Sequence, residues 1–120
     1  RAAMLIHLNN MLKGYAGIQV AIPERLVDFL NLGVTPVVNG FGSVGEGDIG
    51  ILSYIGLGLM GEGLVDYEGN RYEAREVFKR LHLKPIRFYA KDGLAVISSN
   101  AVSFSRLSLL IPKIKNLLLV

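Results

Sequence analysis

The chain has 120 residues, of which 51% are hydrophobic and 19% charged, with a formal net charge of +3 and no cysteine. This length fits one small domain, and the lack of cysteine excludes disulfides and thiolate metal sites. The basic residues accompany no nucleic-acid-binding motif, and no uninterrupted apolar run reaches the roughly 18 residues that span a bilayer, so we expect neither nucleic acid nor a membrane as a partner.

The predicted elements of the first part are helical. A helix should run from the start to about Lys13, where Gly14 stops it. Pro23 is expected at the first position of a second helix that reaches Leu32 and ends at Gly33. Pro36 favours extended chain over residues 34–38.

The second part alternates a small hairpin with further helices. A helix is predicted over about 48–60, then a hairpin over residues 64–72 that turns at Gly69-Asn70, then a helix over 73–82. Asp92 is a good N-cap for another helix. Residues 101–119 look helical again, with Pro112 either starting a new helix or kinking this one. The fold class predicted is mainly α with a small β-hairpin.

A glycine-dense loop from Gly42 to Gly50 feeds directly into the helix at 48–60. Residues 45–50 match the dinucleotide-binding pattern G-x-G-x-x-G, and acidic residues follow about 20 positions later. A dinucleotide-binding module is therefore one alternative. The carboxylates of Glu46 and Asp48 count against it, because they would lie beside a pyrophosphate, and helices dominate the rest.

The two carboxylates of this loop also have a purely structural interpretation, in which glycines let helices pack closely and Asp48 caps the next helix. Glu46 has no such role. A carboxylate among four glycines is a candidate acid, base or ligand.

Several segments together resemble the histidine and aromatic amino-acid ammonia-lyase family. RAAMLIHLNNMLKGYAGI is similar to that family's RANSLLKGYSG, and LVDFLNLGVTPVV to its LLNAGVYPVV. GSVG before an acid, then GEG, a Tyr-x-Gly hairpin, LKP and KDGLA follow in the family's order. The resemblance covers nearly the whole chain. It implies that residues 1–120 are a single partial domain, a fragment of a larger, mainly helical and tetrameric ammonia-lyase-like protein.

The resemblance also implies elimination of ammonia from histidine or an aromatic amino acid by a methylidene-imidazolone made from Ala-Ser-Gly. The family's GSVGASGD corresponds here to Gly42-Ser43-Val44-Gly45-Glu46-Gly47-Asp48, with one residue missing and Glu46 in place of Ala-Ser. Without the serine there is no side chain to dehydrate. We therefore expect no such cofactor.

A second departure lies in the segment that corresponds to the family's KEGLALLNGTQ. Ser98 occupies the position of the Asn that lies beside the electrophile. Asn100 comes two residues later, which on a helix is a rotation of roughly 200° to another face, so we expect that it does not simply substitute.

The remaining polar candidates favour no metal site. His7 and His82 lie on different predicted helices without paired spacing. Tyr54 is a candidate to reach a pocket, although a core tyrosine is the commoner outcome. A polar stripe that includes Ser103 and Ser105 either lines a cavity or bonds back to its own helix.

These observations favour a cytoplasmic, homo-oligomeric lyase of amino-acid catabolism, which takes a small-molecule amino acid and is inactive as the isolated fragment. The alternative is a non-catalytic relative that binds an amino acid or serves assembly. The predicted catalytic residues are Glu46, Gly47, Asp48 and Ser98, and the predicted substrate-binding residues are Tyr54 and Asn100.

Overall fold

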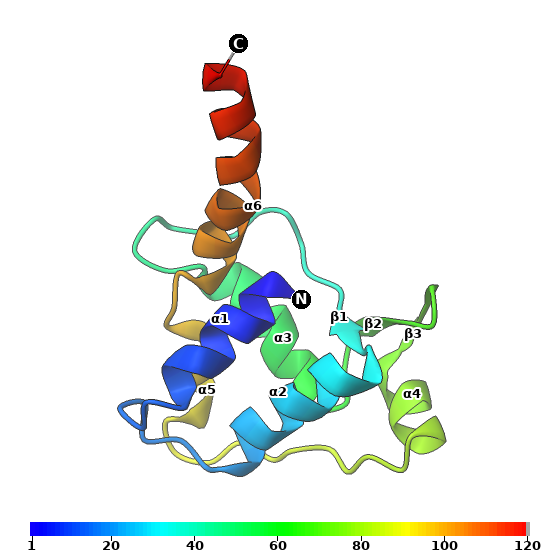
Figure 1. Cartoon of the computed structure of the whole chain (residues 1–120). Coiled ribbons are helices and arrows are strands. Elements are labelled where there is room, and N and C mark those ends of the chain that lie inside the picture. Colours follow the sequence, from blue (N-terminus) through cyan, green and yellow to red (C-terminus); the bar gives the residue numbers. More distant parts are fainter. Residues whose placement is uncertain (120) are drawn as a thin grey trace.

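The computed structural model of the chain describes residues 1–119, so Val120, the last residue of the predicted domain, lies outside the described residues. Six helices and three short strands make up this part (Figure 1). In chain order they are α1 (Ala2–Met11), α2 (Ala21–Leu32), β1 (Thr35–Pro36), α3 (Ile49–Leu59), β2 (Leu64–Tyr67), β3 (Asn70–Glu73), α4 (Ala74–Arg80), α5 (Asp92–Ile97) and α6 (Ala101–Leu118). The prediction of a mainly helical chain with a small hairpin is confirmed.

The first two helices end where glycine allows them to. Gly14 has a φ of +79° three residues after α1, and Gly33 closes α2 with a φ of +75°. One prediction for α2 is wrong: the helix begins at Ala21, so Pro23 is its third residue instead of its first. Pro23 is tolerated there because the amides of the first helical turn have no intrahelical acceptor.

The three strands form one antiparallel sheet in the order β1-β2-β3. The predicted hairpin pairs Val65 with Tyr72 across its turn, and β1 adds to its free edge with Thr35 opposite Asp66. Among the described residues there is no parallel pair of strands, which the dinucleotide-binding alternative required. That alternative is not favoured, because the sheet is antiparallel and the glycine loop follows a strand of only two residues.

The core lies around α3, whose apolar residues face α2, α5 and the sheet. Phe29 of α2 is fully buried, and Phe78 of α4 packs edge-on against it, with ring centroids 5.9 Å apart. Gly58 lets β1 approach α3 closely, since a Cβ there would lie 2.8 Å from Cγ of Pro36. This packing fixes α3, and with it the end of the glycine loop.

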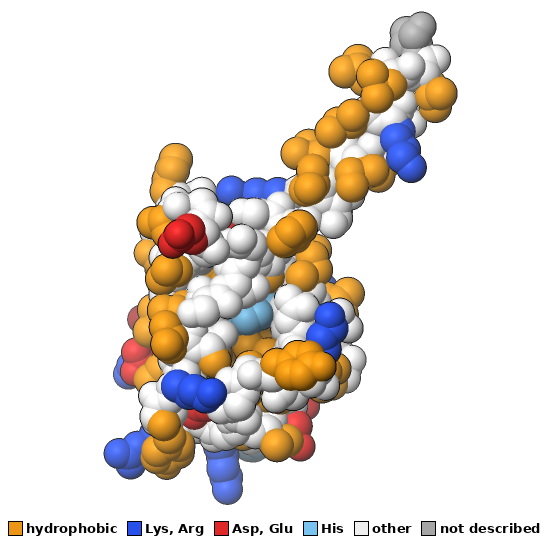
Figure 2. Space-filling view, turned by 90° about the vertical axis from the view of Figure 1, so that its left-hand side faces the viewer, with side chains coloured by type: hydrophobic (Ala, Val, Ile, Leu, Met, Phe, Trp, Pro, Cys, Tyr) orange, Lys and Arg blue, Asp and Glu red, His pale blue; other side chains and the backbone are white. Residues whose placement is uncertain are grey.

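Helix α6 projects from the rest of the molecule (Figure 1). Pro112 lies inside this helix without ending it, so the alternative in which a new helix starts there is wrong. A kink at Pro112 stays a prediction. Figure 2 shows hydrophobic side chains along the projecting arm, where Leu109, Leu117 and Leu118 are exposed.

The stretch Asp92–Leu118, which joins α5 to α6, is long and apolar enough to cross a membrane by length and composition, since it contains an 18-residue window with a mean hydropathy of 1.5. The sequence prediction considered only uninterrupted apolar runs. Core helices of soluble proteins pass the same test, so the expectation of no membrane partner stays a prediction.

Candidate functional site: the glycine loop and the α5–α6 break

The glycine loop closes on itself at its two ends. The amide of Gly50 donates to the carbonyl of Gly42 at 3.0 Å. A Cβ on Gly50 would lie 2.9 Å from that same oxygen and 3.1 Å from Cα of Gly42. Gly42 itself has a φ of +114°, a conformation that favours glycine. Both glycines are thus required where the loop enters α3.

Asp48 fixes the far end of the loop to the start of α6. Its side chain is fully buried, and it accepts hydrogen bonds from the amide of Ser103 at 2.8 Å and from the Ser103 hydroxyl at 2.7 Å. Its own amide donates to the carbonyl of Ser99 at 2.9 Å. Asp48 holds the N-cap position of α3 but makes no side-chain cap there. The predicted capping of the next helix is wrong, because the carboxylate caps α6 instead.

The carboxylate of Asp48 stays ionised in this buried position. Burial acts to raise its pKa, but hydrogen bonds from the amide and hydroxyl of Ser103, with further ones from Ser43 and the amide of Val102, lower the pKa below its ordinary value. A charged acceptor at the N-terminus of a helix also meets the favourable end of the helix dipole. Each oxygen of Asp48 accepts a hydrogen bond from Ser103, so this residue holds the loop against the start of α6.

Glu46 lies at the exposed tip of the loop, within a turn that the amide of Val44 closes by donating to the carbonyl of Gly47 at 3.2 Å. Its carboxylate makes no hydrogen bond or ion pair with the residues that the structure describes. Gly47 is buried behind it. The turn offers no hydroxyl side chain between Gly45 and Asp48, so these residues do not fit a methylidene-imidazolone made from Ala-Ser-Gly.

The segment facing the loop is a break between two helices, formed by residues 98–100. Helix α5 ends at Ile97, and Ser98 has a ψ of +71°. The rotation of roughly 200° expected for Asn100 relative to Ser98 is therefore wrong, because it assumed a continuous helix. Ser98 is exposed, whereas Oδ1 of Asn100 is buried and has no hydrogen-bond partner among the described residues.

This free oxygen follows from how α6 is capped. Asn100 is the N-cap residue of α6 but makes no side-chain cap. The amide of Ala101 donates to Oγ of Ser99 at 3.1 Å, and the amide of Ser103 donates to Asp48. Asn100 thus remains available to a donor from outside the described residues.

Tyr54 lies on α3, one turn beyond the loop, and is half-buried. Its hydroxyl accepts a hydrogen bond from Nδ2 of Asn39, in the segment that leads into the loop. It is neither a fully buried core residue nor a free one. Of the polar stripe on α6, Ser105 donates to the carbonyl of Val102 at 2.7 Å and also lines a cavity, so both alternatives predicted for the stripe hold at Ser105.

A buried carboxylate that the sequence interpretation treated as a cap joins distant segments instead. Asp92 accepts from the amide of Tyr89 at 2.9 Å, and from the amide and side chain of Gln19 at 3.2 and 2.6 Å. Lys91 holds the N-cap position of α5. The hydrogen bond from Tyr89 is local, whereas the two from Gln19 are long-range and no local pattern marks them.

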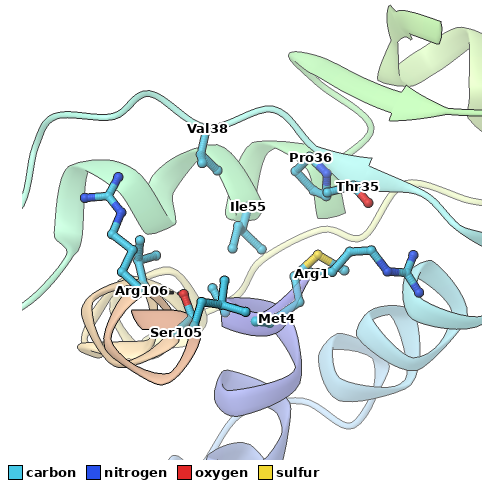
Figure 3. Close-up of a pocket in the computed structure, with 12 residues that line it drawn as sticks. Arg1, Met4, Thr35, Pro36, Val38, Ile55, Ser105 and Arg106 are labelled. Carbon is cyan, nitrogen blue, oxygen red and sulfur yellow. Dashed lines mark hydrogen bonds between the residues drawn. The ribbon is translucent and has the colours of Figure 1, made fainter. Parts of the chain in front are cut away.

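A separate cavity of about 220 Å³ lies between α1, β1, α3 and α6 (Figure 3). Met4 and Ile55 contribute apolar surface to it, and the guanidiniums of Arg1 and Arg106 point away from its interior. Arg1 donates to the carbonyl of Leu30 at 2.8 Å, outside the cavity. None of the predicted catalytic or substrate-binding residues lines this cavity, but Ser105 of the polar stripe does. Ser98 instead borders a cavity of about 270 Å³ with Lys91.

The family model described as aromatic amino acid lyase matches residues 1–120. The chain belongs to this family. Among the family's members, histidine ammonia-lyase of Macrococcus caseolyticus is 41% identical over 104 residues, which are 86% of this chain and 21% of that protein. Histidine ammonia-lyase of Geobacillus sp. (strain WCH70) is 43% identical over 99 residues, 82% of this chain and 20% of its own. The chain thus spans about a fifth of the length of these lyases.

Solved structures of the family share the fold described above. An ergothioneine-degrading ergothionase from Treponema denticola has a TM-score of 0.92 at 35% identity, covering 97% of this chain and 23% of its own. A phenylalanine ammonia-lyase from Rhodosporidium toruloides has a TM-score of 0.84 at 33% identity, covering 89% and 17% respectively. The resemblance inferred from the motifs is therefore confirmed for family and fold.

Proposed function

We propose that the full-length protein that carries this segment eliminates ammonia from histidine or an aromatic amino acid. The observation that supports this is the glycine loop of a lyase-family chain, held by Asp48 against the α5–α6 break. In the reaction, a base removes the proton from the carbon next to the amine-bearing carbon. A carbon–carbon double bond forms, and the electron pair of the carbon–nitrogen bond leaves with nitrogen as ammonia.

The chain's own residues would serve this reaction without the family's electrophile. Glu46 has the exposed carboxylate of the loop, and we assign it the role of acid or base. Gly47 and Asp48 hold the loop backbone beneath it. Ser98 borders the neighbouring cavity and is the other polar group assigned to catalysis.

Two side chains are assigned to substrate binding. Asn100 has a buried amide oxygen with no hydrogen-bond partner in the described part of the chain, which suits the ammonium group of an amino acid. Tyr54 is assigned to the aromatic or imidazole part of the substrate. We also propose a cytoplasmic homo-oligomer, since the exposed leucines of α6 need cover in the full-length protein.

The second candidate function is a non-catalytic relative that binds an amino acid or serves assembly alone. The absence of a serine between Gly45 and Asp48 favours it. A further substrate candidate is ergothioneine, because the ergothionase covers 97% of this chain with a TM-score of 0.92.

The test is an assay of the full-length protein with histidine, ergothioneine, phenylalanine and tyrosine, each followed for consumption and for an unsaturated acid. Ammonia is measured with the three amino acids. Product from any of the four supports a lyase, whereas binding without product supports the second candidate. Mass spectrometry of the peptide with residues 42–48 should show its unmodified mass, and a loss of water from that peptide would contradict the absence of the electrophile.

A further inference from the structure

His7 is a buried histidine that the proposed chemistry does not use. It lies on α1 with only 3% of its surface exposed. Its Nε2 is 2.7 Å from the carbonyl oxygen of Val96, on α5. Because a carbonyl only accepts, Nε2 carries the proton and Nδ1 is the bare nitrogen of a neutral ring.

The second ring nitrogen makes this arrangement sensitive to acid. Nδ1 is buried and has no hydrogen-bond partner among the described residues. A proton added there would have no acceptor, and the charge would lie in the core between two helices. Burial lowers the pKa of His7 below its ordinary value of 6.5, and the hydrogen bond to Val96 only partly offsets this effect.

Among the described residues, no carboxylate is hydrogen-bonded to His7 to compensate for a proton on its ring. The carboxylate of Asp92, on α5, is engaged by Gln19 and Tyr89. None of the charged residues of α2, α6 and the start of α5 is hydrogen-bonded to His7 in the described part of the chain; they are Glu24, Arg25, Asp28, Lys91, Arg106, Lys113 and Lys115. The imidazolium form would therefore be unpaired.

The position of this contact connects it to the site. Helix α5 has six residues and packs chiefly on α3. The hydrogen bond from His7 to Val96 joins α5 to α1. Val96 is two residues before Ser98, where the break of residues 98–100 begins. We propose that His7 is a positioning residue, a neutral latch that holds α5 and the adjoining break against α1 and that acid releases.

The sign of the effect follows from the lowered pKa. The unfolded chain takes up the proton at a higher pH than the folded one, so stability is full above pH 6.5 and declines as the pH falls towards the folded value. The test compares the unfolding midpoint of the full-length wild type with His7→Gln and His82→Gln between about pH 7.5 and 5.0. Glutamine at position 7 keeps a donor for Val96 but cannot be protonated, and His82 is exposed.

We expect the midpoints of wild type and His82→Gln to fall equally with pH, and that of His7→Gln to fall less. Equal slopes for all three would overturn the proposal. If His7→Gln does not fold, deuterium exchange at the C2 carbon of the two histidines in the wild type decides. Slower exchange at His7 than at His82 supports the latch, and equal rates refute it. Neither measurement depends on lyase activity.

Discussion

Removing the hydroxyl of Ser103 should loosen the glycine loop and the start of α6 together. This hydroxyl donates to the buried carboxylate of Asp48 at 2.7 Å, while the Ser103 amide donates to its other oxygen at 2.8 Å. Ser103→Ala removes the first bond and leaves the second. Ser108→Ala is the matched control, because the exposed Ser108 only donates to the carbonyl of Phe104 one turn back on the same helix.

The expected size follows from the charge on the acceptor. A hydrogen bond to a charged group contributes about 1.5–3 kcal/mol, and each 1.4 kcal/mol is roughly tenfold in an equilibrium constant. Amides that this contact protects should thus exchange about ten- to hundredfold faster in Ser103→Ala. Ser108→Ala should change local stability by no more than about 0.5 kcal/mol. Asp48→Asn should accelerate exchange more than Ser103→Ala does, because the side-chain amide at position 48 would face two hydrogen-bond donors.

Hydrogen exchange followed by mass spectrometry on the full-length protein measures this directly. The informative peptides cover residues 42–50 and 99–105. Both should exchange faster in Ser103→Ala, and neither in Ser108→Ala. Wild-type exchange rates in Ser103→Ala, or acceleration confined to 99–105, would refute the inference that Asp48 couples the loop to α6.

Three further predictions concern the same framework. Gly50→Ala should lower the free energy of unfolding by about 1–3 kcal/mol, since its Cβ would lie 2.9 Å from the carbonyl oxygen of Gly42. The control is Gly40→Ala, whose Cβ would meet nothing within 4 Å and whose thermal midpoint should match wild type. A Gly50→Ala midpoint equal to wild type would contradict this. Asp92→Asn should lower the free energy of unfolding by about 1.5–3 kcal/mol, because it removes the charge that accepts three hydrogen bonds. Unchanged hydrogen exchange at the amides of residues 15–20 would contradict this prediction. The pKa values of Asp48 and Asp92 lie below 3.8, so their stabilisation is full above pH 3.8 and is lost as the pH falls through the lower folded values. Unfolding followed by circular dichroism in which the stability of the wild type does not decline at any pH below 3.8 would be inconsistent with that.

The helices and the hairpin were predicted well, because residues close together in the sequence determine where these elements begin and end. Gly33 ends α2, as the residues indicate. A hairpin joins β2 to β3 as predicted, but it turns at Glu68-Gly69, because Asn70 already pairs with Tyr67 as the first residue of β3. The pairing of β1 with β2 was not predicted, since a strand of two residues has no periodicity. The loop pattern G-x-G-x-x-G matched a dinucleotide fingerprint by spacing alone, and the antiparallel sheet shows why spacing is insufficient without the surrounding topology.

The site was predicted less completely because its contacts span long stretches of sequence. Asp48 precedes α3 in sequence, and the rule for capping assigned it to that helix, yet its carboxylate reaches α6, 55 residues away. Separate helices after Asp92 and from residue 101 were predicted, but the rotation expected for Asn100 assumed that residues 98–100 are helical, whereas Ser99 and Asp48 cap a new helix at Ala101. No pattern in the sequence marks the contact between His7 and Val96.

The most direct test of the proposed lyase is ammonia release from the preferred amino acid by three full-length proteins: wild type, Glu46→Gln and Glu62→Gln. Glu46 is the exposed carboxylate of the loop, and Glu62 is an exposed glutamate beyond α3. Loss of a general acid or base typically costs about 10²–10⁴-fold in rate. We predict release by wild type and Glu62→Gln, and at least a hundredfold decrease in Glu46→Gln. Wild-type activity in Glu46→Gln would contradict the role of Glu46, and no ammonia from the wild-type protein would contradict the lyase itself.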